Sequence, residues 1–131
     1  MMMQSQSFVD WLTLELVRRG SRFAFGVPGG GVSLDFIAAA QSAGMRTVIT
    51  AREDAAAMMA GVAGRLANAP GVAFSTKGPG LASATNGLAS ALLDRMPVLF
   101  VAENFDAGEL AYLSHQVFNQ AALAASLFGD K

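Results

Sequence analysis

The chain of 131 residues contains no cysteine and a single histidine, His115. A disulfide framework and a thiolate metal site are therefore excluded, and an imidazole-rich metal site is not expected. We predict no metal-binding residues in this chain. The lack of cysteine fits a reducing cytoplasm without requiring one.

Charged residues are scarce as well. Lys, Arg, Asp and Glu make up 15% of the chain, whereas an average soluble domain carries about 25%. The net charge of −1 provides no field that would attract nucleic acid or an anionic membrane, so we expect neither partner. A surface so poor in charge favours contact with another protein.

A membrane segment is not expected either. The first seven residues lack the basic stretch followed by an apolar stretch that marks a signal peptide. The uncharged stretch 110–129 is long enough to span a bilayer, but its polar residues, His115 among them, make insertion costly. We therefore expect a cytoplasmic protein.

Apolar residues dominate instead, at 53% with 25 Ala and 14 Gly, which is typical of one packed domain. Their spacing predicts helices that alternate with short buried strands. The helices are expected at about 7–19, 32–43, 53–67, 81–95 and 119–128, and the strands at about 23–27, 46–50, 72–75 and 98–102. Because the strands lack polar alternation, we predict an α/β fold with a parallel sheet buried on both faces.

Four special loops each follow a predicted strand directly. They are Pro28 to Gly31, Arg52 to Asp54, Thr76 to Gly80, and Glu103-Asn104. Parallel pairing brings the carboxyl ends of all strands to one edge, which is where open α/β sheets bind ligands. The sequence therefore predicts a ligand site at this edge.

Each feature also has a structural interpretation. The cluster Gly29-Gly30-Gly31 either holds an anion before a helix or makes a tight turn, and it matches neither the dinucleotide pattern nor the P-loop. Glu53 and Asp54 suit a helix start, with Arg52 as their surface partner.

Other residues are expected to be ordinary. Met58-Met59 and the pair Phe23 and Phe25 are interpreted as core residues rather than ligand contacts. His115 lies in an irregular segment, where a solvated loop residue is more common than a catalytic one.

Together these loops resemble the N-terminal, pyrimidine-binding domain of thiamine diphosphate-dependent enzymes of the acetolactate synthase, benzoylformate decarboxylase and sulfopyruvate decarboxylase group. The resemblance covers about Phe8 to Phe128. It rests on Phe25-Gly26-Val27-Pro28-Gly29-Gly30-Gly31, on Thr50-Ala51-Arg52-Glu53 with the alanine-rich helix that follows, on Pro70-Gly71-Val72, on Ser75-Thr76-Lys77-Gly78-Pro79-Gly80, and on Leu93-Asp94-Arg95-Met96-Pro97-Val98-Leu99.

The resemblance implies roles for individual residues. The Glu53 carboxylate would hydrogen-bond N1′ of the cofactor's aminopyrimidine and favour its imino tautomer, as the catalytic group that activates the cofactor. Pro28, Gly29 and Thr76 would join Glu53 in binding the cofactor. Substrate-side candidates are Arg52, Asn104 and His115. Arg52 stands where many family members have histidine, which argues against a histidine relay at that place.

The resemblance also implies partners. Family members hold the diphosphate through Mg²⁺ in a second domain, by a Gly-Asp-Gly and asparagine motif that this sequence lacks. Mg²⁺ is therefore expected only through a diphosphate-binding domain or subunit outside this chain. The family fold is a three-layer sandwich with a mostly parallel central sheet. Residues 1–131 would form its pyrimidine-binding domain, truncated at the C-terminus and lacking the last helix and strand.

Three functions stay open at this point. The first is one half of a thiamine diphosphate-dependent lyase or transferase that decarboxylates or joins small 2-oxo acids, inactive as this chain alone and assembled as a homo-oligomer. The second is a non-catalytic α/β interaction or regulatory module. The third, a small nucleotide-binding domain, rests only on the glycine cluster.

Overall fold

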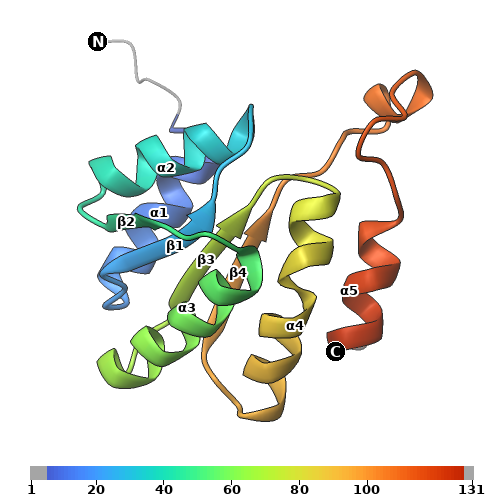
Figure 1. Cartoon of the computed structure of the whole chain (residues 1–131). Helices are drawn as coiled ribbons and strands as arrows, with labels where there is room; N and C mark the ends of the chain where they lie inside the picture. Colours follow the sequence, from blue (N-terminus) through green and yellow to red (C-terminus); the bar gives the residue numbers. More distant parts are fainter. Residues whose placement is uncertain (1–5, 129–131) are drawn as a thin grey trace, which may run out of the picture.

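A computed structural model describes residues 6–128, in which strands and helices alternate (Figure 1). The ends of the predicted domain, residues 1–5 and 129–131, lie outside the described residues. The helices are α1 (Phe8–Arg18), α2 (Val32–Ser42), α3 (Glu53–Ala67), α4 (Pro79–Leu93), the 3₁₀ helix η1 (Glu109–Ala111) and α5 (Gln120–Phe128). The strands are β1 (Phe23–Val27), β2 (Arg46–Ile49), β3 (Gly71–Ser75) and β4 (Val98–Ala102).

The four strands form one parallel sheet in the order β2-β1-β3-β4. Helices α1 and α2 lie on one side of it and α3 and α4 on the other, with α5 packed against α4 (Figure 1). This arrangement confirms the predicted three-layer α/β sandwich with a parallel central sheet.

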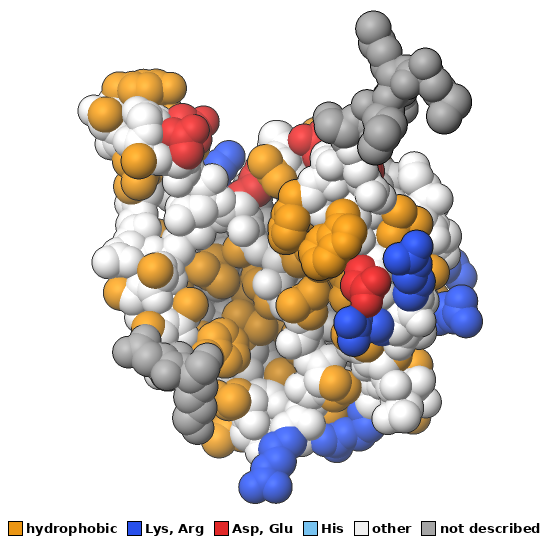
Figure 2. Space-filling model, turned by 180° about the vertical axis from the view of Figure 1, so that it is seen from behind, with side chains coloured by type: hydrophobic (Ala, Val, Ile, Leu, Met, Phe, Trp, Pro, Cys, Tyr) orange, Lys and Arg blue, Asp and Glu red, His pale blue; other side chains and the backbone are white. Residues whose placement is uncertain are grey.

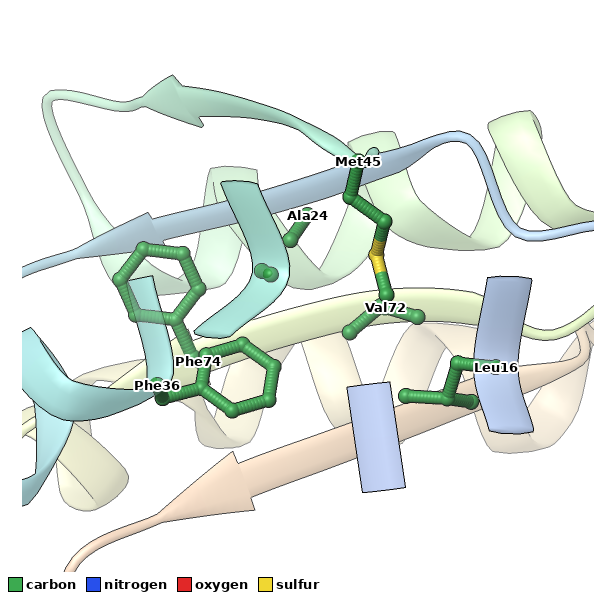
Figure 3. Packing of buried hydrophobic residues seen from close by; sticks show 7 residues of the cluster. Leu16, Ala24, Phe36, Met45, Val72 and Phe74 are labelled. Atoms are coloured by element: carbon green, nitrogen blue, oxygen red, sulfur yellow. The ribbon is translucent and has the colours of Figure 1, made fainter. Parts of the chain in front are cut away.

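The core on the α1 and α2 side is built from large side chains. Phe36 of α2 and Phe74 of β3 are each 1% exposed, and their ring centroids lie 5.6 Å apart (Figure 3). Leu16 of α1 and Val72 of β3 belong to the same cluster. Alternate residues of β3 point to opposite faces, so Ala73 contributes to the core on the α3 side.

The core on the α3 side uses small side chains instead. Ala56 and Ala60 are fully buried there, and a Cβ built on Gly87 of α4 would overlap the backbone of α3. Such close approach leaves no room for long side chains. Met58 and Met59 point outward, 40% and 43% exposed, so their assignment to the core was wrong.

The assignment of the phenylalanine pair to the core is half correct. Phe25 is buried, whereas Phe23, the first residue of β1, is 39% exposed. The middle residues of β1 are buried, whereas Phe23 lies at the exposed start of the strand.

Large apolar side chains remain exposed on several elements. Phe8 and Trp11 of α1 are 70% and 51% exposed, and Leu66 of α3 is 83% exposed. Seen from behind, the molecule has a hollowed face with much hydrophobic surface, and most of the visible Lys and Arg side chains lie at the bottom and on the right (Figure 2). Among residues 6–128, no helix is long and apolar enough to cross a membrane.

Candidate functional site

The four special loops do meet at one edge of the sheet. All four strands are parallel, so the segments that follow them emerge at the same rim. Strand β1 lies between β2 and β3, and the chain reverses its direction of progress across the sheet at β1. Such a reversal is where open α/β sheets bind ligands. The predicted convergence is therefore confirmed.

The loop after β1 is held against the loop after β3. The backbone N–H of Gly29 donates to Ser33 Oγ at 3.0 Å, which closes the turn into α2. A Cβ built on Gly29 would overlap the Thr76 side chain. Glycine is therefore required here by contact with Thr76, and two of the predicted cofactor-binding residues are brought together. Pro28, which precedes them, is half-buried.

Glu103 is the centre of this part of the rim. It follows β4 directly and is 6% exposed. Its Oε2 accepts a hydrogen bond of 2.9 Å from Thr76 Oγ1 and lies 3.6 Å from Lys77 Nζ. Its Oε1 accepts a hydrogen bond of 3.3 Å from the Ser33 N–H in the first turn of α2. One carboxylate thus joins the loops that follow β1, β3 and β4.

Gln120, the first residue of α5, links the loop after β3 to the end of β4. It is buried, and its Oε1 accepts a hydrogen bond from the Gly78 N–H. Its Nε2 donates to the Glu103 carbonyl oxygen at 2.8 Å. Gly78 has φ +63° and precedes Pro79, with which α4 begins two residues earlier than predicted.

Glu53 lies at the start of α3, after β2. It is half-buried, and within residues 6–128 its carboxylate has no hydrogen-bond or ion-pair partner. Because strands in a sheet are spaced at about 4.8 Å, the ends of β2 and β3, with β1 between them, lie about 10 Å apart. Glu53 and Thr76 therefore stand on opposite sides of the Pro28 loop.

Arg52 is engaged by Asp54. Its Nε and Nη2 each donate to a different carboxylate oxygen at 2.9 Å. The Arg52 hydrogen bond is the largest cause that lowers the pKa of Asp54, to about 2, and the same pair raises the pKa of Arg52. This is the contact that the surface-partner interpretation predicts, while a substrate-side role for Arg52 stays a prediction.

The other substrate-side candidates lie apart from Glu103. Asn104 is exposed, and its Oδ1 accepts a hydrogen bond of 2.9 Å from the next backbone N–H, that of Phe105. His115 is exposed in the long connection between η1 and α5. The structure does not bring either side chain into the Thr76 network, and their roles stay predictions.

Glu103 and Gln120 are the residues that sequence reasoning missed. The sequence places both Glu103 and Asn104 on the rim, and the predicted substrate-side role fell on Asn104 alone. The available signal was an acidic residue directly after a predicted strand. Gln120 had no local signal, because its two partners lie 42 and 17 residues away in sequence.

The glycine cluster has an anion of its own. The N-cap of α2 is Gly31, which has no side chain to cap the helix. The Glu103 carboxylate accepts a hydrogen bond from the Ser33 N–H in the first turn instead. An external phosphate at this helix start would face that carboxylate. This argues against the nucleotide-binding interpretation. Among residues 6–128, no three His, Cys, Asp or Glu side chains are grouped to hold a metal ion.

Comparison with known proteins identifies relatives. The family model described as "Thiamine pyrophosphate enzyme, N-terminal TPP binding domain" matches residues 6–124. The acetolactate synthase of Bacillus subtilis (strain 168) is 35% identical over 108 residues, which are 82% of this chain and 19% of that protein. The chloroplastic acetolactate synthase of Arabidopsis thaliana is 32% identical over 98 residues, 75% of this chain and 15% of that protein. The chain thus spans a fifth or less of the length of these relatives.

Proposed function

Because the chain belongs to the family of N-terminal TPP-binding domains of thiamine pyrophosphate enzymes, we propose that it binds the aminopyrimidine end of thiamine diphosphate. In this proposal Glu53 activates the cofactor. The whole protein, of which this chain would supply one half of the cofactor site, decarboxylates or joins small 2-oxo acids in the manner of acetolactate synthase.

The observation that carries the proposal is the state of Glu53. Glu53 is the first residue of α3, at the ligand-binding edge of the sheet, and is half-buried. Its carboxylate has no hydrogen-bond or ion-pair partner within residues 6–128. The neighbouring cation, Arg52, is bound by Asp54. The acceptor oxygens of Glu53 are therefore left for a group outside the chain, and the chemistry of a carboxylate fits a protonated ring nitrogen.

Glu53 would hold a proton against N1′ of the ring and so favour the imino tautomer. When bound, thiamine diphosphate supplies the nucleophilic carbon and the electron sink for making and breaking carbon–carbon bonds next to a carbonyl. A proton shared between a carboxylate and a ring nitrogen needs a fixed, dehydrated setting. Glu53 is half-buried at the start of α3, and the diphosphate-binding domain or subunit would complete such a setting.

Pro28, Gly29 and Thr76 would line the same ring. Gly29 and Thr76 are in contact, and both lie beside the reversal point of the sheet. Arg52, Asn104 and His115 remain candidates for the substrate side. They lie on loops of the same rim or on the connection after it.

The remaining parts of the site would come from elsewhere. Mg²⁺ and the diphosphate would be held by a diphosphate-binding domain or subunit, and the assembly would be a homo-oligomer. The exposed apolar surface and low charge of this chain favour such partners. The chain on its own would be inactive.

The experiment assembles the chain with its diphosphate-binding domain or subunit and follows exchange of the cofactor C2 proton. Glu53→Gln keeps the size of the side chain but cannot hold the proton as a carboxylate. We expect exchange to slow by about 10² or more, as is typical for loss of an acid–base group. Glu109→Gln, at the start of η1 beyond β4, is the matched control and should exchange like wild type. Equal exchange in the Glu53→Gln and wild-type assemblies would favour the non-catalytic module instead.

A further inference from the structure

The arginines of the chain are gathered at one edge of the sheet. We call it the amino edge, because the four parallel strands begin there, opposite the rim that carries Glu53. The helices end at this edge, since each runs back along the sheet to the start of the next strand. Six of the seven arginines lie at a helix end or a strand start there, namely Arg18, Arg19, Arg22, Arg46, Arg65 and Arg95. The net charge of −1 therefore does not describe this edge, which is basic.

Most of these arginines have no acidic partner. Arg18 and Arg19 both pair with Glu15 of the same helix. Within residues 6–128, the structure shows no ion pair for the other four, which are Arg22, Arg46, Arg65 and Arg95. An exposed charge that its own chain does not neutralise is available to a partner of opposite charge.

Two of the unpaired arginines line a groove between the end of α3 and the start of β4. Its cavity of about 680 Å³ is lined by Arg65 and Arg95 and by the apolar residues Met96 and Pro97. Arg65 Nη2 donates to the backbone carbonyl of Arg95 at 3.3 Å, so the two residues are neighbours. A guanidinium presents five N–H donors in a planar fork, which matches a carboxylate through two parallel hydrogen bonds. We call this cavity the arginine groove.

Arg95 occupies a backbone position that favours glycine. Its φ is +52°, and the N–H of the next residue, Met96, donates back to the Ala91 carbonyl at 2.8 Å. Helices α1 and α2 end with the same hydrogen-bond pattern, and there the left-handed residue is Gly20 or Gly44. The helix dipole favours a cation near this end, but an uncharged glycine serves at both of those helices. The chain thus keeps an arginine at position 95 in spite of a conformational cost, which is typical of a residue retained for binding.

An apolar pocket adjoins the arginine groove. Its cavity of about 510 Å³ shares Gly64 and Pro70 with the groove, so the two are side by side. One cation, Arg22, belongs to its lining. The large apolar side chains of the lining include Phe23, Val48, Met59 and Leu66. Pockets of this size, mostly apolar with a few polar groups, are typical of binding sites.

We propose that the amino edge binds an acidic protein segment, with carboxylates on Arg22 and Arg95 and an apolar side chain in the pocket between α3 and the sheet. The starts of β1 and β4 are two strand intervals apart, or about 10 Å. An extended segment rises by about 3.3 Å per residue. Acidic residues three or four positions apart, with an apolar residue between them, would therefore reach both arginines.

The composition of the edge favours a protein over a nucleic acid. Arginine is enriched and lysine depleted at protein interfaces, and within residues 6–128 this edge carries arginine and no lysine. A nucleic acid offers phosphates, but it has no aliphatic side chain for the apolar pocket. Glu15 and Asp94 also lie near this edge and would repel a continuous phosphate backbone. The site is at the opposite edge from Glu53 and does not depend on the proposed function.

The first experiment measures fluorescence anisotropy of a labelled peptide with the 131-residue chain, in about 0.15 M salt to screen weak surface attraction. The peptide has the core Glu-Ser-Leu-Ser-Glu, whose acidic and apolar side chains share one side when the peptide is extended. Replacing both Glu by Lys should abolish binding, and replacing Leu by Ser should weaken it about tenfold. A lysine peptide or a short single-stranded DNA that binds as tightly as the acidic peptide would overturn the proposal.

The second experiment repeats the titration with variants of the chain. Arg95→Gln should lower the affinity for the acidic peptide about threefold, and Arg22→Gln together with Arg95→Gln about tenfold. Arg52→Gln is the matched control, because it removes the same charge at the opposite rim, and it should bind like wild type. An equal loss of affinity in Arg52→Gln would assign binding to overall charge and overturn the proposal.

Arg95→Gly separates binding from folding. Glycine suits the positive φ at this position, so the Tm of this variant should equal or exceed that of wild type. Its affinity for the acidic peptide should nevertheless fall as much as in Arg95→Gln. Wild-type affinity in Arg95→Gly would overturn the proposal.

Discussion

Arg52 and Asp54 form a two-pronged ion pair across the start of α3, with both N–H···O distances at 2.9 Å. Glu53 stands between them in the sequence and shares in neither bond. Without Arg52, Asp54 would lose both of these hydrogen bonds, and two adjacent carboxylates would begin the helix without this cation beside them. The pair therefore neutralises Asp54 and leaves the Glu53 carboxylate available at the rim.

This relationship predicts how the Asp54 carboxyl titrates. Its pKa is lowered from 3.8 to about 2 in the folded chain, chiefly by the Arg52 hydrogen bond. Asp54 thus favours folding above about pH 4, and that contribution is lost as the pH falls toward about 2. In Arg52→Gln, the Asp54 carboxyl should titrate nearer 3.8, and urea midpoints should change less between these pH values.

The measurement is carboxyl carbon NMR across pH 5 to 2, together with urea unfolding at about the same pH values. Arg46→Gln is the control, because Arg46 is exposed at the start of β2, at the opposite edge of the sheet. That variant should leave the Asp54 titration as in wild type. An Asp54 titration that is unmoved by Arg52→Gln would contradict the ion pair.

Much of the fold was predictable because its signals are local. The bounds of β1, α3 and β4 agree with those expected from apolar runs and punctuation by glycine, proline and acids. The start of α4 was misplaced by two residues. Proline suits the first turn of a helix, and Gly78 with its positive φ supplies the turn before it, so Gly78-Pro79-Gly80 belongs to the helix start.

The site was predictable only in part. The position of a loop on the rim follows from strand direction, which is why Glu53, Gly29 and Thr76 could be placed there. The pairing of Glu103 with Thr76 joins residues 27 apart, and depends on how β3 and β4 align. Met58 was misjudged for a similar reason. A helix face of alanine and glycine can approach a sheet so closely that the longer side chains must turn outward.

A second prediction concerns Gly29. A Cβ at this position would overlap the Thr76 side chain, whose hydroxyl is held by Glu103. We expect Gly29→Ala to lower the free energy of unfolding by about 2 kcal/mol, as in other overpacked sites. At Gly30 a Cβ meets nothing within 4 Å, so Gly30→Ala is the matched control and should change stability little. Urea unfolding of the two variants compares them directly, and equal stabilities would contradict the contact with Thr76.

A third prediction concerns the buried amide of Gln120. Its side chain is the partner of the Gly78 N–H and of the Glu103 carbonyl. Gln120→Leu would leave both backbone groups buried without a partner, so we expect a loss of about 2 to 4 kcal/mol. Gln41→Leu removes an exposed hydrogen bond to Thr47 and should cost less than about 0.5 kcal/mol. Thermal or urea unfolding measures both, and similar losses would show that Gln120 is not a buried link.

A fourth prediction concerns the outer face of α3. Met58, Val62 and Leu66 follow one another at intervals of four residues and are 40%, 50% and 83% exposed, so they form one apolar stripe along α3. We expect the chain to self-associate through this face at high concentration, because removing apolar surface from water lowers the free energy. Val62→Glu with Leu66→Glu should shift sedimentation or light scattering toward the monomer. Phe8→Glu replaces an apolar residue of α1 that is 70% exposed, and it should leave the association unchanged. A wild-type chain that stays monomeric at high concentration would contradict the prediction. An equal response to Phe8→Glu would indicate non-specific hydrophobic association rather than a contact through α3.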